Sequence, residues 1–217
     1  MSLDEMRVAY RRGTLLEELL GTDPFAALTA WLREAADAGA REPNAMALAT
    51  VDDQGRPSLR MVLCKGVDDH GIVFYTNLGS RKAIDMERTS RAAATFWWEV
   101  GERQVRIEGR VERVSDAEAD AYFARRPRGS RLGAWASPQS RPVAGREELE
   151  RRLEEVRRRF GEDDPVPRPD FWGGYRIVPD RIEFWQGRED RLHDRVVFER
   201  AEEGASGAAW RQVRLAP

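Results

Sequence analysis

Short apolar runs alternate with turn-forming residues through most of the chain. The runs at 45–51, 59–65 and 72–77 are separated by DDQGRPS and GVDDHG, whose Gly, Pro and Asp residues favour tight turns. Over 104–114 apolar and polar residues alternate, as on a strand with one buried face. The pattern predicts further strands at 92–98, 175–186, 194–200 and 210–215. About eight short strands joined by tight turns favour a closed or nearly closed antiparallel barrel.

Helical patterns lie between and around these strands. Residues 23–39 have a Thr22 or Asp23 cap, Pro24 in the first turn and an apolar stripe at helical spacing. Residues 162–169 are typical of an extended, proline-rich connector. Further helices are predicted at 80–88, 115–127 and 145–160.

The same pattern predicts the domain organisation. Residues 1–22 are mostly polar and charged, which predicts an N-terminal arm outside the core. Residues 23–217 are expected to form a single domain that is mainly β with peripheral helices (α+β). A doubly wound parallel sheet is disfavoured, because the early strands follow one another without crossover helices.

Composition excludes several classes of protein. The 217 residues, 41% hydrophobic and 34% charged, are typical of a soluble globular protein. No apolar run approaches a membrane span or a signal peptide, so we expect a cytoplasmic protein without membrane association. The lone Cys64 excludes an internal disulfide and a cysteine-based metal site, and no metal is expected. A net charge of −2 argues against general nucleic-acid binding.

The chain uses arginine as its ordinary cation. Of its 36 basic residues, only Lys65 and Lys82 are lysines. A compact ammonium differs from a planar guanidinium in what it binds, so these two positions are candidates for a specific role. Chance retention is the alternative.

Two basic segments are candidate anion sites. In YTNLGSRKA, Ser80 can cap a helix whose first turn carries Arg81 and Lys82, and such a helix start can bind phosphate. The alternative is an ordinary helix start with solvated basic residues. Arg60 and Lys65 lie on a predicted strand, where parity places them on opposite faces unless a bulge or the strand end intervenes.

A second set of anion-binding groups lies in AYFARRPRGS. Tyr122 and Arg126 are four residues apart on one helix face, and Ser130 follows just beyond Pro127. A phenol, a guanidinium and a hydroxyl together suit a phosphomonoester dianion. Two separate anion sites in one small domain suggest two phosphorylated small molecules, such as a cofactor and a substrate.

The segment FWQGREDRLHDR holds one of the two histidines, His193, close to Trp185, Arg191 and Arg195. If 191–195 is a strand, Arg191 and His193 share one face. The alternative is a twisted strand end with a solvated charged face. The other histidine, His70, lies in a turn and is expected to be solvated.

Six segments together resemble the pyridoxine/pyridoxamine 5′-phosphate oxidase family: RMVLCK, FYTNLGSRKA, ERQV, YFARRPRGSRLGAWASPQS, FWGGYRI and IEFWQGREDRLHDR. The terminal RLAP is similar to that family too. The likeness covers nearly the whole chain, in the same order and at matching spacings. It implies a split antiparallel β-barrel that works as a homodimer, with FMN held at the subunit interface.

The resemblance also implies roles for individual residues. FMN contacts are implied for Arg60, Met61, Val62, Leu63, Cys64, Lys65, Tyr75, Thr76, Arg81, Lys82, Gln104, Gln139, Ser140, Trp185 and Arg195. Substrate contacts are implied for Arg7, Tyr10, Lys65, Tyr122, Arg126, Ser130, Arg191, Leu192 and His193, with Arg191 and His193 nearest the reacting carbon. Arg7 and Tyr10, in the arm, match positions that fold over the substrate.

The implied reaction moves a hydride from C4′ of pyridoxamine or pyridoxine 5′-phosphate to the flavin, with O2 as the acceptor that yields H2O2. Two other functions stay open: an FMN oxidase of another ring system, such as a phenazine, and a non-catalytic FMN- or pyridoxal-phosphate-binding module. The set Tyr122, Arg126 and Ser130 argues against the first, since such substrates carry no phosphate. Arg191 and His193 argue against the second.

Overall fold

A computed structural model describes residues 2–6, 9–201 and 209–217. Its centre is a nine-stranded sheet in which all neighbours are antiparallel, ordered β2-β1-β5-β6-β7-β4-β3, with β8 on β7 and β9 on β8. The strands are β1 (Ala45–Val51), β2 (Pro57–Leu63), β3 (Gly66–Asp68), β4 (Gly71–Asn77), β5 (Arg91–Trp98), β6 (Arg103–Arg113), β7 (Trp172–Gln186), β8 (Asp194–Arg200) and β9 (Trp210–Leu215).

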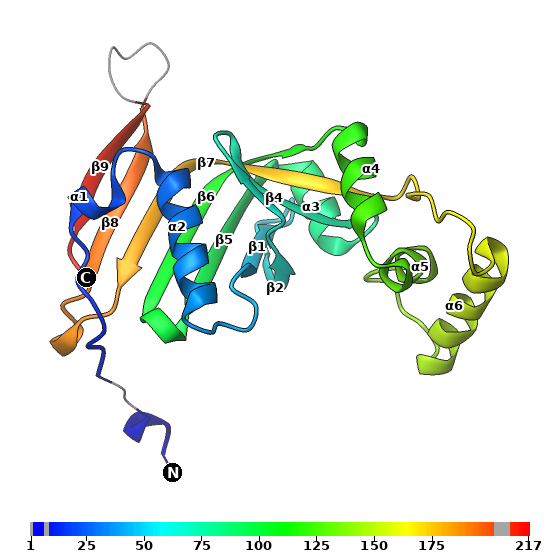
Figure 1. Cartoon of the computed structure of the whole chain (residues 1–217), viewed down its shortest axis with the longest axis horizontal. Coiled ribbons are helices and arrows are strands. Elements are labelled where there is room, and N and C mark those ends of the chain that lie inside the picture. The colour runs from blue at the N-terminus through cyan, green and yellow to red at the C-terminus, as the bar shows by residue number, and fades with distance from the viewer. Residues whose placement is uncertain (1, 7–8, 202–208) are drawn as a thin grey trace.

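The long strand β7 gives the sheet its curl (Figure 1). Its first half pairs with β4 and its second half with β8, while β6 runs along both halves. The β6–β7 register shifts between Glu108 and Gly109, where a Cβ on Gly109 would lie 2.1 Å from the Val178 carbonyl oxygen. The result is a curled antiparallel half-barrel with helices around it, which confirms the mainly β, split-barrel prediction.

Helices cover the sheet and extend it at one end (Figure 1). They are α1 (Glu17–Leu20), α2 (Pro24–Asp37), α3 (Arg81–Thr89), α4 (Asp116–Arg125), α5 (Arg128–Ala136) and α6 (Arg146–Phe160), with 3-10 turns η1 (Leu3–Glu5), η2 (Glu99–Gly101) and η3 (Glu189–Arg191). The sequence did not predict α5. Among the described residues, no helix is both long and apolar enough to cross a membrane.

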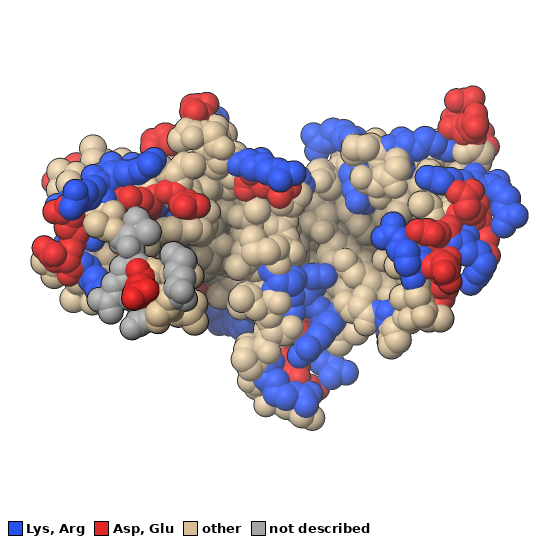
Figure 2. All heavy atoms as spheres, turned by 90° about the horizontal axis from the view of Figure 1, so that it is seen from below, with Lys and Arg blue, Asp and Glu red and all other residues tan. Residues whose placement is uncertain are grey.

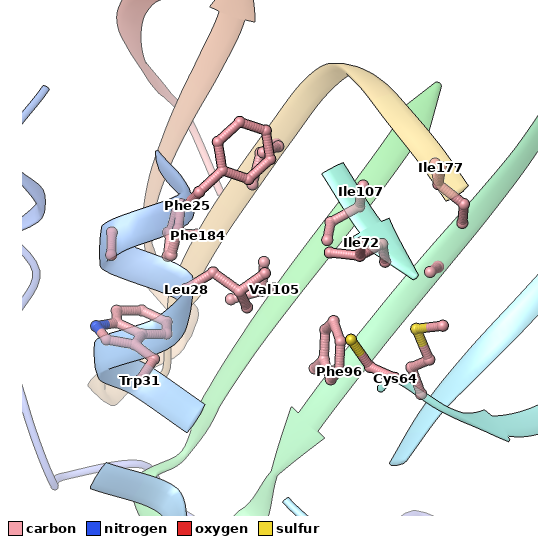
Figure 3. Packing of buried hydrophobic residues seen from close by; sticks show 14 of the residues in the cluster. Phe25, Leu28, Trp31, Cys64, Ile72, Phe96, Val105, Ile107, Ile177 and Phe184 are labelled. Carbon is pink, nitrogen blue, oxygen red and sulfur yellow. The ribbon is translucent and has the colours of Figure 1, made fainter. Parts of the chain in front are cut away.

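The core lies between α2 and one face of the sheet (Figure 3). Asp23 caps α2 by accepting the Phe25 N–H at 2.9 Å, as its sequence predicts. The helix then directs Phe25, Leu28 and Trp31 toward the strands, where Trp31 meets Phe184 edge-on with ring centroids 5.0 Å apart. This packing holds β6 and β7 in place and leaves the opposite face of the sheet uncovered by α2.

The N-terminal segment is more closely packed than its polar sequence predicts. Leu15 and Leu20 are buried in the main core cluster. The Leu15 N–H donates to Asp194 at 3.0 Å, and Arg214 pairs with Glu17 at 2.7 Å. These contacts bind the segment to the C-terminal strands and so bury two leucines among charged neighbours. Arg7, one of the expected substrate contacts, lies outside the described residues.

Candidate active site

A cavity of about 1010 Å³ lies between the sheet and helices α4 and α5. Figure 2 shows the hollow between the central part of the molecule and the lobe that carries α4 to α6, with basic side chains on both of its sides. Its lining includes most of the residues predicted from the sequence: Arg60, Met61, Val62, Leu63, Lys65, Tyr75, Thr76, Arg81, Lys82, Tyr122, Arg126, Ser130, Gln139 and Ser140.

Lys82 is a buried cation held by neutral groups. Its Nζ donates to Thr76 Oγ1 (3.1 Å), Ser80 Oγ (3.2 Å) and Gln139 Oε1 (3.4 Å). Burial, assisted by the charge of Arg60, lowers the Lys82 pKa to about 8. The predicted Ser80 side-chain cap of α3 is not formed; Ser80 occupies the N-cap position, but its hydroxyl accepts from Lys82. An anion beside this ammonium would relieve the cost of its burial.

Arg60 is held in a fixed orientation beside it. Its Nη1 donates to the Leu48 carbonyl (3.1 Å) and Thr50 Oγ1 (2.7 Å), and its Nη2 donates to Ser58 Oγ (2.6 Å). Thr50 in turn donates to the buried Asp85 carboxylate at 2.7 Å. Burial lowers the pKa of the Arg60 guanidinium. The Arg60 guanidinium is thus positioned by neutral acceptors, and among the described residues it forms no ion pair with a carboxylate.

Stacked aromatic rings form the opposite wall. Tyr75 and Tyr122 stack with centroids 4.0 Å apart, and Trp172 lies parallel to Tyr75 at 5.5 Å. Gly174 makes this possible, since a Cβ there would lie 2.7 Å from the Tyr75 ring. The wall joins β4, α4 and β7, three elements that are distant in sequence.

Arg126 is the cation of this wall. Its guanidinium lies over the Trp172 ring at 4.8 Å and the Phe123 ring at 5.4 Å. Its Nη1 is buried without a hydrogen-bond partner, and burial lowers its pKa. A buried donor without a partner costs free energy, and a bound phosphate would satisfy it. Arg126 ends α4 and Ser130 lies on α5, so the turn between these helices brings both to the cavity.

The basic residues of the cavity differ from most others in the protein. Within the described ranges, none of them has a carboxylate at ion-pair distance, whereas arginines on β6, β7 and α6 pair with Asp or Glu. A group of cations left without counter-charges is suited to anionic ligands. These residues are Arg60, Lys65, Arg81, Lys82, Arg125 and Arg126.

The end of β2 resolves the parity conflict between Arg60 and Lys65. The strand was expected to continue to Lys65, but it ends at Leu63, and the Lys65 N–H donates to the Val73 carbonyl at 2.7 Å. Both side chains therefore line the cavity. The Cys64 side chain instead lies in the core, where burial raises its pKa to about 11.

A second group of predicted residues lies on the far part of the sheet. Gln104, Trp185 and Arg195 are direct cross-strand neighbours on β6, β7 and β8 and form one row. The Tyr10 ring packs edge-on against Trp185 and His193, with both centroid separations 5.7 Å. The predicted flavin-side and substrate-side residues of the C-terminal segment are thus close to one another.

The predicted strand geometry of 191–195 is wrong. Glu189–Arg191 forms the turn η3, with φ of 54° at Asp190 and 62° at Arg191, and β8 begins only at Asp194. Left-handed backbone at two non-glycine residues breaks the alternation, so Arg191 and His193 do not share a strand face. Leu192 is exposed.

The local hydrogen bonds define the state of His193. Its Nδ1 accepts the Arg188 N–H at 3.1 Å, so the neutral imidazole carries its proton on Nε2. Burial, together with the Arg191 charge, lowers the His193 pKa. His193 is therefore a neutral donor at neutral pH. His70, by contrast, is a solvated turn residue, as predicted.

One chain does not bring the two groups together. Trp172 in the cavity and Trp185 in the second group are thirteen residues apart on β7. At about 3.3 Å per residue, that strand covers roughly 40 Å between them. Figure 1 shows α4 and α5 at one end of the molecule and the β7–β8 connection at the other.

Some lining residues were not predicted. Asn77 and Ser137 lie beside predicted positions in quoted segments, and Trp172 belongs to FWGGYRI, so proximity to a motif was the available signal. Arg125 had the same signal, since it precedes the predicted Arg126 in a quoted segment, whereas Ser58 had none, because a serine in a predicted turn is common.

Known proteins match both halves of the chain. A pyridoxamine 5′-phosphate oxidase family model matches residues 32–160, and one described as the pyridoxine 5′-phosphate oxidase C-terminal dimerisation region matches residues 172–217. The pyridoxine/pyridoxamine 5′-phosphate oxidase of Rubrobacter xylanophilus is 57% identical, over 98% of this chain and 95% of its own. That of Cupriavidus taiwanensis is 54% identical over 99% of both.

Two solved structures have a similar fold. PhzG from Burkholderia lata, in complex with tetrahydrophenazine-1-carboxylic acid, is 32% identical with a TM-score of 0.84, over 94% of this chain and 98% of its own. A pyridoxamine 5′-phosphate oxidase-related, FMN-binding protein from Nostoc punctiforme is 19% identical with a TM-score of 0.67, over 89% and 95%, and supports the fold alone.

The curled half-barrel and its structural matches define a protein of the split-barrel fold. The chain belongs to the pyridoxine/pyridoxamine 5′-phosphate oxidase family, as its six quoted segments indicate.

Proposed function

We propose that this protein oxidises pyridoxamine 5′-phosphate and pyridoxine 5′-phosphate to pyridoxal 5′-phosphate, with FMN as cofactor and O2 as electron acceptor. Close relatives of this enzyme class cover nearly the full chain. The single observation that carries the proposal is the cavity whose six cations lack carboxylate partners in the described structure. The amine reaction consumes O2 and water and releases ammonia and H2O2; the alcohol reaction consumes O2 and releases H2O2.

The residues present fit the phosphate of FMN. Arg60 and Lys82 are oriented by neutral acceptors, and Arg81 stands at the start of α3 beside them. Together they offer several charge-assisted donors to a dianion. When bound, FMN supplies the hydride acceptor and its reaction with O2. This protein's share is to hold the phosphate and to exclude water from the ring.

The substrate phosphate fits the aromatic wall. Arg126 has a buried donor without a partner, and Tyr122 and Ser130 line the same part of the cavity. We assign Lys65, which lines the cavity at the end of β2, to the reacting rings of flavin and substrate rather than to either phosphate. This division gives each phosphate its own cations and leaves Arg191, Leu192 and His193 to meet the substrate from another direction.

A homodimer would supply that direction. The family match over 172–217 is to a dimerisation region. On the sheet face not covered by α2, Leu59 and Met61 are 68% and 65% exposed, and Trp97 is 46% exposed. A second copy would cover this apolar surface and place its Gln104, Trp185 and Arg195 row, with Arg191 and His193, against the cavity. A monomer by light scattering with FMN still bound would contradict this arrangement.

The direct test is H2O2 release from pyridoxamine 5′-phosphate by protein reconstituted with FMN. The purified protein is expected to show a flavin absorption spectrum and to bind FMN more tightly than riboflavin, because only FMN carries the phosphate. Equal affinity for the two flavins would contradict the assignment of Arg60, Arg81 and Lys82. A flavin-loaded protein without H2O2 release would favour a non-catalytic binding module.

A second candidate function is oxidation of a phenazine-type ring. It is favoured by one observation, the match to PhzG with its bound tetrahydrophenazine-1-carboxylic acid. The donors of Tyr122, Arg126 and Ser130 argue for a phosphorylated substrate instead. Turnover of a reduced phenazine carboxylate with no turnover of pyridoxamine 5′-phosphate would make this second function the better supported one.

The cytoplasmic location stays a prediction.

His193→Asn is expected to lower turnover by about ten-fold or less, which is on the order of 1.4 kcal/mol in the barrier. The lone pair of the substrate's own amine or alkoxide drives loss of the hydride, so the imidazole orients the substrate rather than acting as an obligatory base. Arg191→Met should cost more, chiefly in kcat/KM, since positioning and charge are both lost. Complete loss of turnover in His193→Asn, with FMN content intact, would show instead that His193 is an essential acid or base.

A further inference from the structure

Glu183 is a buried carboxylate on the open face of the sheet. It lies on β7 two residues before Trp185, so the two side chains share a face. Its side chain is only 1% exposed. Since an ionised group is rarely buried unless its surroundings compensate it, this position requires strong partners.

Arg195 is the principal partner. Its Nε and Nη2 donate to the two Glu183 oxygens, each at 2.9 Å, in a bidentate pair. Its Nη1 donates to the Ala216 carbonyl at 3.0 Å. The guanidinium plane is therefore fixed from two sides, while each Nη keeps one N–H free for another acceptor.

Two further arginines add positive charge near the Glu183 carboxylate, but their longer distances do little to fix its orientation. Arg181 and Arg106 lie 3.4 and 3.6 Å from Glu183 Oε2. Burial raises the pKa of the Glu183 carboxyl, but the Arg195 hydrogen bonds and the three positive charges outweigh it, so the pKa lies below its ordinary value. Glu183 is accordingly ionised at neutral pH.

We propose that Glu183 is a positioning residue that orients the Arg195 guanidinium toward the flavin held in the cavity of the other subunit. The inference rests on the proposed function, because that function gives Arg195 its ligand. Gln104, Trp185 and Arg195 form one cross-strand row, and Glu183 holds the last member of that row in line with the other two.

The test is a double-mutant cycle on FMN affinity, read from quenching of flavin fluorescence and from the visible absorption bands of the bound flavin. Glu183→Gln keeps the shape of the side chain but removes its charge and one of the two acceptors that Arg195 uses. FMN affinity is expected to fall about ten-fold, which is the loss of roughly one charge-assisted hydrogen bond. In an Arg195→Met background the same change should have no further effect.

Whether FMN affinity falls or rises in Glu183→Gln distinguishes an orienting role of Glu183 from an effect of its charge alone. Removing a negative charge near an anionic ligand would by itself tighten FMN binding, so tighter binding in Glu183→Gln would overturn the inference. Equal, additive losses in both backgrounds would overturn it too, since they would show a role independent of Arg195. Rescue is expected from Glu183→Asp, which keeps the carboxylate, with an affinity between those of the wild type and Glu183→Gln.

Glu108→Gln is the matched control. Glu108 contacts Arg106 and Arg181, as Glu183 does, but not Arg195, and it is 41% exposed. Its FMN affinity should match the wild type, and a loss equal to that of Glu183→Gln would contradict the inference. Wild-type protein that binds no flavin would overturn the proposed function and this inference together. Flavin binding with an additive cycle would overturn this inference alone.

Discussion

Heterodimers that combine an Arg126→Met subunit with an Arg191→Met subunit are expected to regain about half the turnover of the wild-type dimer. Each variant alone is expected to lose on the order of 100-fold in kcat/KM, from a missing charged hydrogen bond or a misplaced substrate. The gain follows from the separation along β7, because a site shared by two chains takes its cavity from one and its 188–195 segment from the other.

The expected recovery of half the turnover depends on each site taking its cavity from one subunit and its 188–195 segment from the other. In the heterodimer, one site combines both altered residues and is inactive, whereas the other combines two unaltered halves. Two different affinity tags and successive purification isolate the mixed species, and H2O2 release per dimer measures it. The control joins Arg126→Met with Lys65→Ala, both on the cavity side, and should regain nothing. Recovery in the control, or none in the test pair, would contradict a shared site.

Lys82→Met is expected to weaken FMN binding roughly 10- to 100-fold, as loss of a charge-assisted hydrogen bond to phosphate predicts. Lys65→Ala should instead keep its FMN content and lower kcat/KM for pyridoxamine 5′-phosphate. Lys82 lies buried among Thr76, Ser80 and Gln139, whereas Lys65 is exposed at the end of β2. Identical behaviour of the two variants would contradict this division.

The pH dependence gives the Lys82 prediction a sign. The Lys82 pKa is lowered to about 8 in the free protein, so its ammonium is lost at a lower pH than for an ordinary lysine. Bound phosphate favours the charged form and raises that pKa, so FMN binding takes up a proton above pH 8. Affinity should therefore fall as pH rises above about 8, although the FMN phosphate, with a second pKa of about 6, stays a dianion.

The slope should disappear in Lys82→Met and remain in Lys65→Ala. Riboflavin binding should show no such slope, because it has no phosphate to interact with the ammonium. Fluorescence titrations between about pH 7 and 9.5 measure FMN binding to the wild type, Lys82→Met and Lys65→Ala, and riboflavin binding to the wild type. An unchanged slope in Lys82→Met would assign the titrating group elsewhere.

Local features of the chain were predictable because they depend on near neighbours. Alternation over 104–114 predicted β6, and Asp23 with Pro24 predicted the start of α2, since both signals act within a few residues. The side chains suited to anions could be named for the same reason. A guanidinium or an ammonium keeps its chemistry wherever the fold places it.

Local signals failed where the packing of the folded chain decided the outcome. The Ser80 hydroxyl binds Lys82 rather than capping α3, because burial leaves that ammonium few other acceptors. Leu15 and Leu20 are core residues despite their charged neighbours, because Asp194 and Arg214 bind this segment to the C-terminal strands. Strand parity at 191–195 failed because η3 reverses the chain before β8 begins.

The sequence by itself determined the strands other than β3, which lies in a segment predicted as a turn, together with most of the helices and the residues with the chemistry to bind two phosphates. Only the tertiary structure decided which of them meet. Pairing of β7 with β4 at one end and β8 at the other places Trp172 and Trp185 far apart, so within one chain the cavity and the row of Gln104, Trp185 and Arg195 stay separate. It also brings Glu183 to Arg195 across two strands. Such pairings join residues that are distant along the chain, and periodicity within a single segment carries no information about its partner.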